Sequence, residues 1–310
     1  MTSIRKNIDF ILTNYNLGNC MSYSSISQGY ANENYKIITN KGSFLFRICK
    51  EQIFEMINYE MKLMESLKKI DFPTAYPIRR KDQEYITKSA IGNIVLYEFK
   101  IGNEPKLGKN VTHEMATAIG TLSLLPDNEN FKKTNVINLP DCLKMIDNFP
   151  NVNCQYPEIF KDFESIIAFL HDSLLIDLPK GVIHGDAFPD NTLFQDEKLV
   201  AIIDFEEANY DNLLFDVGMT INGFCFKNNI LEKELAQTFL SGYNETRPLS
   251  LTEKNLTYHY IMWGAIGMAY WHLRHLVKRP YKTQQNRVKE LINRVKIFQK
   301  SKQYKSLFTL

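Results

Sequence analysis

The sequence predicts an α+β protein with two lobes, a small antiparallel sheet followed by a larger, mainly helical part. In roughly the first 100 residues, short apolar or alternating runs are separated by turn residues such as Asn40-Lys41-Gly42. Such runs are typical of antiparallel strands and hairpins. After about Gly102, longer segments with apolar residues at helical spacing dominate the chain. We therefore place an N-terminal lobe at 1–102 and a C-terminal lobe at 103–310.

The elements of the N-terminal lobe follow from local patterns. The expected strands are Tyr23–Ser27, Glu33–Thr39, Ser43–Cys49, Tyr85–Lys88 and Ile94–Phe99. The segment Ile53–Lys69 is expected to be a helix, because apolar residues recur in it every three or four positions and Pro73 follows its end.

The C-terminal lobe should combine helices with a short β patch. The expected helices are Thr112–Leu125, Pro157–Leu175, Leu213–Phe224, Glu232–Ser241, Thr252–Leu276 and Gln284–Lys300, and the expected strands are Val182–Ile183, Thr192–Phe194 and Leu199–Phe205. The longest apolar run, Ile261–Trp271, is too short for a helical membrane span, which needs about 20 residues. We interpret this run as part of a buried helix.

Charge and cysteine content exclude several classes of protein. The 310 residues include 37 Lys plus Arg and 35 Asp plus Glu, a balance that argues against a dedicated nucleic-acid binder. Five scattered cysteines form no C-x-x-C pair, so neither a disulfide framework nor a zinc knuckle is indicated. The first sixteen residues lack the pattern of a signal peptide, which favours a cytoplasmic location.

The balance of charge hides two uneven segments. Residues 181–220 contain nine acidic residues and one lysine, whereas residues 271–310 contain eleven basic residues and one glutamate. The basic segment is expected to be a solvated or dimer-facing surface.

The acidic segment carries the most informative motif. Asp186 follows His184 and Gly185, and Asn191 comes five residues after it; a hydrophobic strand then ends at Asp204. This is the spacing of a kinase catalytic loop followed by a metal-binding aspartate. Asp186 would accept or orient the proton of an attacking hydroxyl, and Asn191 and Asp204 would be oxygen ligands of the magnesium ion that bridges the ATP phosphates. The structural alternative is an acidic loop between two strands.

With these motifs the chain resembles the aminoglycoside phosphotransferase and choline kinase superfamily, which has a protein-kinase-like fold. More narrowly, it resembles the homoserine kinases built on that fold. The matching segments are VIHGDAFPDNTLF, IIDFEEA, LLFDVGMTINGFCF, SGYNETRPLSLTE and the N-terminal MSYSSISQGYANENYKIIT. The resemblance runs unevenly from about residue 20 to about residue 275. It implies an ATP- and magnesium-dependent kinase of threonine biosynthesis that phosphorylates L-homoserine.

The resemblance also implies an ATP site in the N-terminal lobe. Backbone N–H groups of the loop with Gly29, and the nearby Ser27 and Asn32, would cover the phosphates. Period-two alternation puts Leu45 and Arg47 on one face of a strand. Leu45 would then face adenine and Arg47 would face the phosphates, in place of the usual kinase lysine.

Several further residues would complete this site. Lys50 is the alternative to Arg47 as the phosphate-binding cation. Glu60, in the middle of the following helix, would fix that cation, unless it is an ordinary surface residue. Glu98 and Phe99 would belong to the hinge between the lobes and would bind the adenine edge through main-chain atoms.

Two residues near the motif are expected to be structural. His184 would pack beneath the catalytic loop and bond to backbone. Asp216 would hold that loop by hydrogen bonds, as the resemblance implies, or would simply favour the positive end of a helix dipole.

The identity of the substrate is less constrained than the reaction. Asp190, Glu206 and Glu207 add carboxylates that favour a cationic substrate, and homoserine, choline, ethanolamine and aminoglycosides all carry a cationic group. Arg247 would pair with a substrate carboxylate, which choline lacks, or would be a surface residue of a loop. Glu206 and Glu207 also depart from the homoserine kinases, which tend to carry aromatic residues at these positions. The sequence AIGTLSLLPDN at the end of the helix 112–125 is a second departure.

Two other functions therefore remain open. One is a choline, ethanolamine or aminoglycoside kinase. The other is a catalytically idle nucleotide-binding protein with a kinase fold, which the glycine-poor loop, the unusual cation and the altered helix would suit. In either case we expect a monomer or homodimer that binds a small molecule, with neither nucleic acid nor membrane as a partner.

Overall fold

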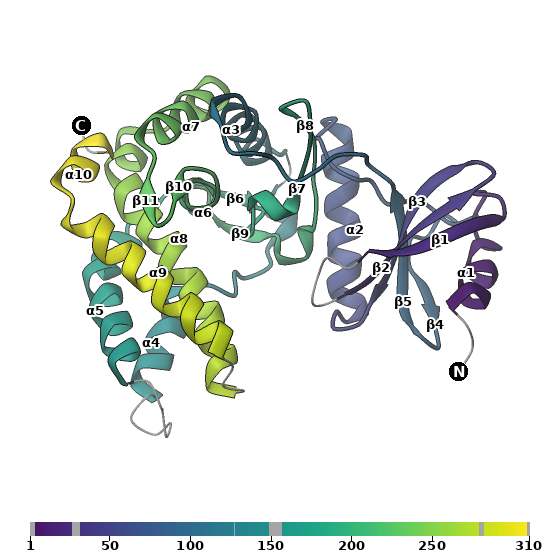
Figure 1. Ribbon diagram of the computed structural model, residues 1–310, viewed down its shortest axis with the longest axis horizontal. Coiled ribbons are helices and arrows are strands. Elements are labelled where there is room, and N and C mark those ends of the chain that lie inside the picture. Colours follow the sequence, from purple (N-terminus) through teal and green to yellow (C-terminus); the bar gives the residue numbers. More distant parts are fainter. Residues whose placement is uncertain (1–3, 27–31, 127, 149–156, 279–281, 309–310) are drawn as a thin grey trace. The chain divides into compact units, whose positions relative to one another are not determined.

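The computed structural model describes residues 4–26, 32–126, 128–148, 157–278 and 282–308 (Figure 1). The chain forms two compact units. Unit 1 comprises residues 1–103, 193–195 and 200–206, and unit 2 comprises the remaining residues. Unit 1 holds a small antiparallel sheet and unit 2 is mainly helical, which confirms the predicted fold class. Within the described ranges, no helix combines the length and the apolar character that crossing a membrane requires.

Unit 1 is built on a five-stranded antiparallel sheet with the order β1-β2-β3-β5-β4. Its strands are β1 (Cys20–Ile26), β2 (Asn32–Thr39), β3 (Gly42–Cys49), β4 (Thr87–Ser89) and β5 (Gly92–Glu98). Thr39 pairs with Gly42, so the predicted turn at Asn40-Lys41 closes a hairpin between β2 and β3. Gly42 has φ +141°, a backbone conformation that glycine adopts without the steric cost that other residues meet.

Two helices cover opposite faces of this sheet, as Figure 1 shows. Helix α1 (Ile4–Leu12) packs Ile8 and Ile11 against Phe46 on one face, and helix α2 (Phe54–Lys69) packs Ile57 and Met61 on the other. Strand β3 alternates between the two layers because successive side chains of a strand point to opposite faces.

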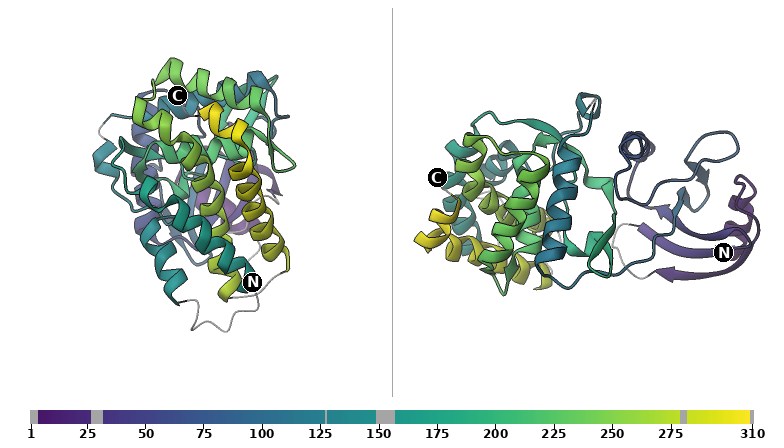
Figure 2. Two further views of the ribbon diagram at one scale, coloured as in Figure 1. Left: turned by 90° about the vertical axis from the view of Figure 1, so that its left-hand side faces the viewer. Right: turned by 90° about the horizontal axis from the view of Figure 1, so that it is seen from above.

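Unit 2 is assembled from helices and short strand pairs. Its helices are α3 (Lys109–Ser123), α4 (Leu139–Asn148), α5 (Pro157–Leu174), α6 (Leu214–Phe224), α7 (Lys233–Thr246), α8 (Leu251–Lys278), α9 (Lys282–Lys300) and α10 (Lys302–Phe308). Strand β6 (Lys180–Ile183) pairs with β9 (Asn209–Asn212), and β10 (Phe226–Lys227) pairs with β11 (Ile230–Leu231). In Figure 2 the yellow helix α9 lies along α8, and α3 lies along α7. Between β6 and β9 the chain forms the pair β7 (Thr192–Gln195) and β8 (Lys198–Ile202), most of whose residues belong to unit 1.

Helices α6 and α8 approach each other unusually closely. A Cβ atom on Gly218 would lie 2.1 Å from the carbonyl oxygen of Tyr260, and one on Gly264 would lie 3.0 Å from the backbone of Gly218. The Asn222 amide nitrogen donates to the carbonyl oxygens of Gly218 (2.8 Å) and Ile261 (2.7 Å). The two glycines and this bridging amide together fix the crossing of the two helices.

The basic C-terminal segment is partly buried in this core. Arg294 of α9 is 8% exposed and donates to the carbonyl oxygen of Asn222 (3.0 Å) and to the side chain of Asn229 (2.9 Å). Its guanidinium also lies 4.8 Å from the ring centre of Phe226. Arg294 therefore meets a carbonyl of the last turn of α6, where a positive charge is favourable.

We predict that Gly218→Ala lowers the free energy of unfolding by about 2–3 kcal/mol, because the new methyl group must push two helix backbones apart. Chemical denaturation would measure the change. The control is Gly108→Ala at the N-cap of α3, where the added Cβ meets no atom within 4 Å and φ is an ordinary −170°. A loss no larger at Gly218 than at Gly108 would contradict the tight crossing.

Candidate active site

The loop after β6 brings two of the predicted site residues together in unit 2. Asn191 lies at the end of a short 3-10 turn, Pro189–Asn191, and its amide nitrogen donates to the Asp186 carboxylate (2.8 Å) and to the Asp186 carbonyl oxygen (2.9 Å). The Asp186 side chain is partly exposed. These two bonds use the amide nitrogen of Asn191 and do not involve its side-chain carbonyl oxygen, which can only accept.

Asp216 of α6 forms hydrogen bonds with the backbone at the start of this loop. The two carboxylate oxygens of Asp216 accept hydrogen bonds from the backbone N–H groups of His184 (2.6 Å) and Gly185 (2.9 Å). Asp216 is 2% exposed, and burial raises the pKa of its carboxyl to about 7 against the effect of these two bonds. The expectation that Asp216 holds the loop by hydrogen bonds is confirmed.

His184 and Gly185 each have a structural reason to occupy the motif. His184 is fully buried, and its Nδ1 accepts a hydrogen bond from the backbone N–H of Asp186 (3.2 Å), as the sequence predicted for a histidine beneath the loop. Gly185 has φ +80°, and a Cβ atom there would lie 3.2 Å from the carbonyl oxygen of Glu207 and from the side chain of Asn209. Any other residue would be strained at this position.

Helix α6 supports the loop at a second point. A Cβ atom on Gly223 would lie 2.8 Å from the ring of Phe188 and 3.1 Å from Pro189. The segment from His184 to Asn191 thus contacts both ends of α6, at Asp216 and at Gly223.

A second group of predicted residues meets in unit 1. Arg47 is 7% exposed and Glu60 is 3% exposed, so both charges are buried. The Arg47 guanidinium lies 3.5 Å from the Asp204 carboxylate and 3.8 Å from Glu60 Oε1. Tyr97 donates its hydroxyl hydrogen to the same Glu60 oxygen (3.1 Å). Burial raises the pKa of Glu60, and Arg47 opposes that shift, as expected for a buried ion pair.

The turn after β8 presents Asp204 and Glu206. Asp204 has φ +68°, a left-handed conformation that is uncommon for residues other than glycine. Glu206 accepts a hydrogen bond from the Asn32 amide (3.0 Å), so the first residue of β2 is tied to this turn. Burial, and then the nearby charge of Asp204, raises the pKa of Glu206 to about 7.

The other predicted nucleotide residues are found in different settings. Ser27 and Gly29 lie outside the described residues. Lys50 pairs with Glu33 (3.1 Å) and its side chain is 41% exposed, so Arg47 rather than Lys50 lies in the buried group. At the predicted hinge, the Glu98 N–H donates to the carbonyl oxygen of Tyr76 (2.9 Å), and the ammonium of Lys36 lies 4.5 Å from the ring centre of Phe99.

The remaining candidate substrate residues all lie in unit 2, except Glu206. Asp190 is exposed, and the carbonyl oxygen of Glu207 accepts a hydrogen bond from Asn209 (2.9 Å). Arg247 forms an ion pair with Glu253 (2.8 Å), whose side chain is 1% exposed in the first turn of α8. Arg247 thus links the end of α7 to the start of α8, a geometry that favours the structural role.

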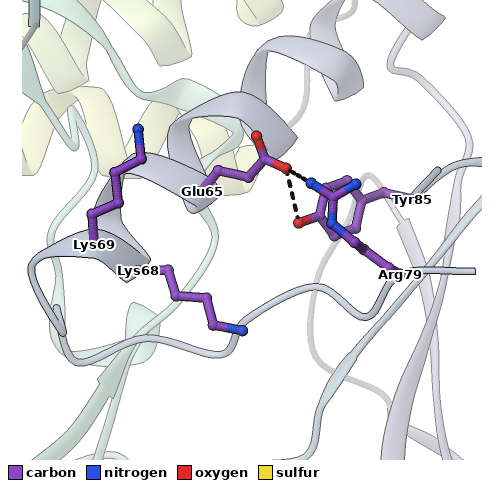
Figure 3. A pocket seen from close by; sticks show the side chains of 5 residues that line it. All are labelled: Glu65, Lys68, Lys69, Arg79 and Tyr85. Carbon is purple, nitrogen blue, oxygen red and sulfur yellow. Dashed lines mark hydrogen bonds and ion pairs between the residues drawn. The ribbon is translucent and has the colours of Figure 1, made fainter. Parts of the chain in front are cut away.

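A hollow of about 460 Å³ at the end of α2 contains none of the predicted site residues (Figure 3). It is lined by Glu65, Lys68, Lys69, Arg79 and Tyr85. The side chains of Arg79 and Tyr85 converge on the Glu65 carboxylate, whereas the two lysines extend away from it. Glu65 therefore uses its carboxylate within the group, and we assign this hollow no part in the function.

The sequence analysis assigned no role to the side chain of Tyr97, which lies within the expected strand Ile94–Phe99. Its position in β5 could have predicted that the side chain is buried and bonded. Val95 and Tyr97 share one face of the strand, so a tyrosine there had to be buried. A buried tyrosine hydroxyl needs a hydrogen-bond partner, and the predicted helix offered Glu60.

Comparison with known proteins identifies the family. Residues 22–249 match the sequence profile of the phosphotransferase enzyme family. The chain belongs to that family. This phosphotransferase is similar to the homoserine kinase of Brucella melitensis, with 30% identity over 250 residues that span 79% of this chain and 76% of the relative.

Two solved structures share the fold of this phosphotransferase. One is the amicoumacin kinase hAmiN in complex with AMP-PNP, Ca²⁺ and Ami, with a TM-score of 0.73, 13% identity and coverage of 95% of this chain and 93% of that chain. The other is the microcompartment-associated aminopropanol kinase, with a TM-score of 0.72, 13% identity and coverage of 95% and 96%. At this level of identity, the likeness shows the fold.

We predict that Glu206 makes the stability of the protein depend on pH. Its pKa is raised from 4.5 to about 7 in the folded state, so its favourable contribution is complete below pH 4.5 and is lost as the pH rises through 7. As the pH rises from 5 to 8, Glu206→Gln should therefore become more stable relative to wild type. Denaturant titration at each pH measures the two free energies of unfolding.

The control is Glu207→Gln, which removes a carboxylate from the same turn but keeps the contact between Asn32 and Glu206. An equal pH-dependent difference for both variants would contradict the prediction.

Proposed function

We propose that the protein is a kinase that transfers the γ-phosphoryl group of ATP to the hydroxyl of L-homoserine, forming O-phosphohomoserine. The observation that carries the reaction type is the pairing of Asp186 with Asn191 on a loop whose backbone is clamped by Asp216. The similarity to a homoserine kinase over three quarters of both chains supports the acceptor. The proposal places the protein in threonine biosynthesis in the cytoplasm.

Asp186 would act on the acceptor hydroxyl. Its carboxylate takes, or orients, the hydroxyl proton while the oxygen attacks the γ-phosphorus and ADP leaves. The partly exposed side chain suits this role, because a small substrate must reach it. The hydrogen bond from Asn191 fixes the orientation of the carboxylate before the substrate arrives.

Asn191 and Asp204 would be ligands of a magnesium ion because of their donor chemistry. Magnesium prefers oxygen ligands and is usually held by one or two carboxylates together with substrate phosphates. The two bonds to Asp186 use the amide nitrogen of Asn191 and not its side-chain carbonyl oxygen, and Asp204 carries its carboxylate in a turn with φ +68°. Magnesium, when bound, would neutralise charge on the phosphates. The AMP-PNP and Ca²⁺ of the amicoumacin kinase support a nucleotide and a divalent cation.

The residues of unit 1 would bind the nucleotide. Arg47, supported by Glu60, would hold the phosphates, because a guanidinium kept in place by a buried carboxylate is a preorganised anion-binding group. Asn32, with Ser27 and Gly29, would cover the phosphates. Main-chain atoms of Glu98 and Phe99 would contact adenine.

The carboxylates of Asp190, Glu206 and Glu207 would favour the ammonium group of the substrate. Arg247 is not assigned to the substrate carboxylate, because its guanidinium already pairs with Glu253. A second candidate acceptor is an amino alcohol, since the aminopropanol kinase shares the fold over almost the whole chain. We expect a monomer or homodimer.

We predict that Asp186→Ala lowers phosphoryl transfer by about 10³-fold or more, because the hydroxyl proton loses its acceptor. ATP binding should stay within about twofold of wild type. A coupled assay of ADP release and calorimetric titration of ATP would measure the two effects. Asp177→Ala, which removes a carboxylate that is 94% exposed, is the control and should retain full activity. Turnover by Asp186→Ala near the wild-type rate would refute the assignment.

The acceptor is tested by supplying purified protein with ATP and magnesium and one candidate at a time: homoserine, choline, ethanolamine, aminopropanol, methylthioribose or an aminoglycoside. We expect the highest kcat/KM with homoserine. Turnover of an amino alcohol without turnover of homoserine would replace the homoserine proposal by the second candidate. Thermal stabilisation by ATP without turnover of any acceptor would favour the idle nucleotide-binding protein.

A further inference from the structure

We propose that Tyr97 is a positioning residue that holds Glu60 and Arg47 in the arrangement in which they bind the ATP phosphates. The proposal rests on the proposed function of Arg47. It adds a residue that the motifs do not contain.

The register of the sheet puts Tyr97 in reach of both partners. Tyr97 on β5 pairs with Leu45 on β3, and Arg47 lies two residues farther along β3 on the same face. Side chains in this diagonal relation are close enough for long or aromatic groups to touch. The Arg47 guanidinium accordingly lies 5.3 Å from the centre of the Tyr97 ring.

One carboxylate oxygen is shared by the two partners. Glu60 Oε1 accepts the Tyr97 hydroxyl hydrogen at 3.1 Å and lies 3.8 Å from the Arg47 guanidinium. Tyr97 therefore contacts the cation with its ring and the anion with its hydroxyl.

The ion pair needs this third member because its own contacts are long. Arg47 reaches its two carboxylates only at 3.5 and 3.8 Å, and its buried Nε has no hydrogen-bond partner among the described residues. Tyr97 is 4% exposed and Glu60 is 3% exposed, so water cannot readily replace a missing contact. Without the hydroxyl, we expect Glu60 to rotate and Arg47 to lose its fixed position.

The first test is Tyr97→Phe, which keeps the ring beneath Arg47 and removes only the hydroxyl. Loss of a buried hydrogen bond to a charged group should weaken ATP binding about tenfold. Calorimetric titration of ATP in the absence of any acceptor measures this directly. In turnover, the KM for ATP should rise by a similar factor while the KM for the acceptor stays within about twofold. An unchanged affinity for ATP would overturn the proposal.

The matched control is Tyr15→Phe. Tyr15 is 3% exposed, and its hydroxyl donates to the carbonyl oxygen of Tyr85 (3.2 Å) and lies 3.4 Å from the Thr87 hydroxyl. It belongs to the hydrophobic cluster that contains α1, whereas Tyr97 belongs to the cluster that contains α2. An equal loss of ATP affinity in both variants would reduce Tyr97 to a general structural role and overturn the proposal.

A double-mutant cycle tests whether Tyr97 acts through Glu60. If it does, the double variant Glu60→Gln with Tyr97→Phe should bind ATP as Glu60→Gln does, and the two losses should not multiply. Independent, multiplying losses would overturn the proposal. Melting temperatures of all four proteins separate a loss of affinity from a loss of folding.

The outcomes distinguish this proposal from the function on which it rests. Wild-type protein that binds no ATP would refute the proposed function and the role of Tyr97 with it. Wild-type protein that binds ATP, together with an unaffected Tyr97→Phe, would refute the role of Tyr97 alone.

Discussion

The hydrogen bonds from the backbone N–H groups of His184 and Gly185 to the carboxylate of Asp216 are the constraint on which the candidate active site depends. They fix the start of the loop that carries Asp186. Asp216 lies on α6, which is itself held by contacts with two other helices. Helix α6 is packed against α8 through Gly218 and is bonded to α9 through Arg294. A loop with little regular structure is therefore anchored to a packed helical core. Such anchoring is needed because a carboxylate that orients a proton must keep a fixed position.

Much of the fold was readable from the sequence because its elements are long or strongly patterned. The helices with clear apolar periodicity and the central strands of the sheet were predicted close to their observed bounds. Helix α1 was not predicted, because its nine residues form a weak local signal and depend on packing against the sheet. The strand β9 was also missed, since the run Asn209–Asn212 is polar and becomes a strand only through pairing with β6.

The candidate site, too, could be predicted from the sequence only in part. The motif placed Asp186 and Asn191 on one loop, where the structure joins them by a hydrogen bond. Alternation along β3 predicted that Arg47 shares a face with Leu45. The partners of Arg47 could not be derived from spacing alone, because a buried cation is stabilised by whichever carboxylates the tertiary structure brings near it. Arg247 is a second example, because only the structure reveals that its ion-pair partner is Glu253.

The burial of Glu206 beside Asp204 affects the release of protons and heat when a cation binds. A carboxyl group with a pKa of about 7 is only partly ionised near neutrality and holds a fraction of a proton. A cation that comes to rest beside Glu206 would displace this fraction into the surrounding buffer. The enthalpy observed on mixing would then vary with the ionisation enthalpy of the buffer, so that calorimetry in phosphate and in Tris would report the occupancy of this turn without any spectroscopic probe.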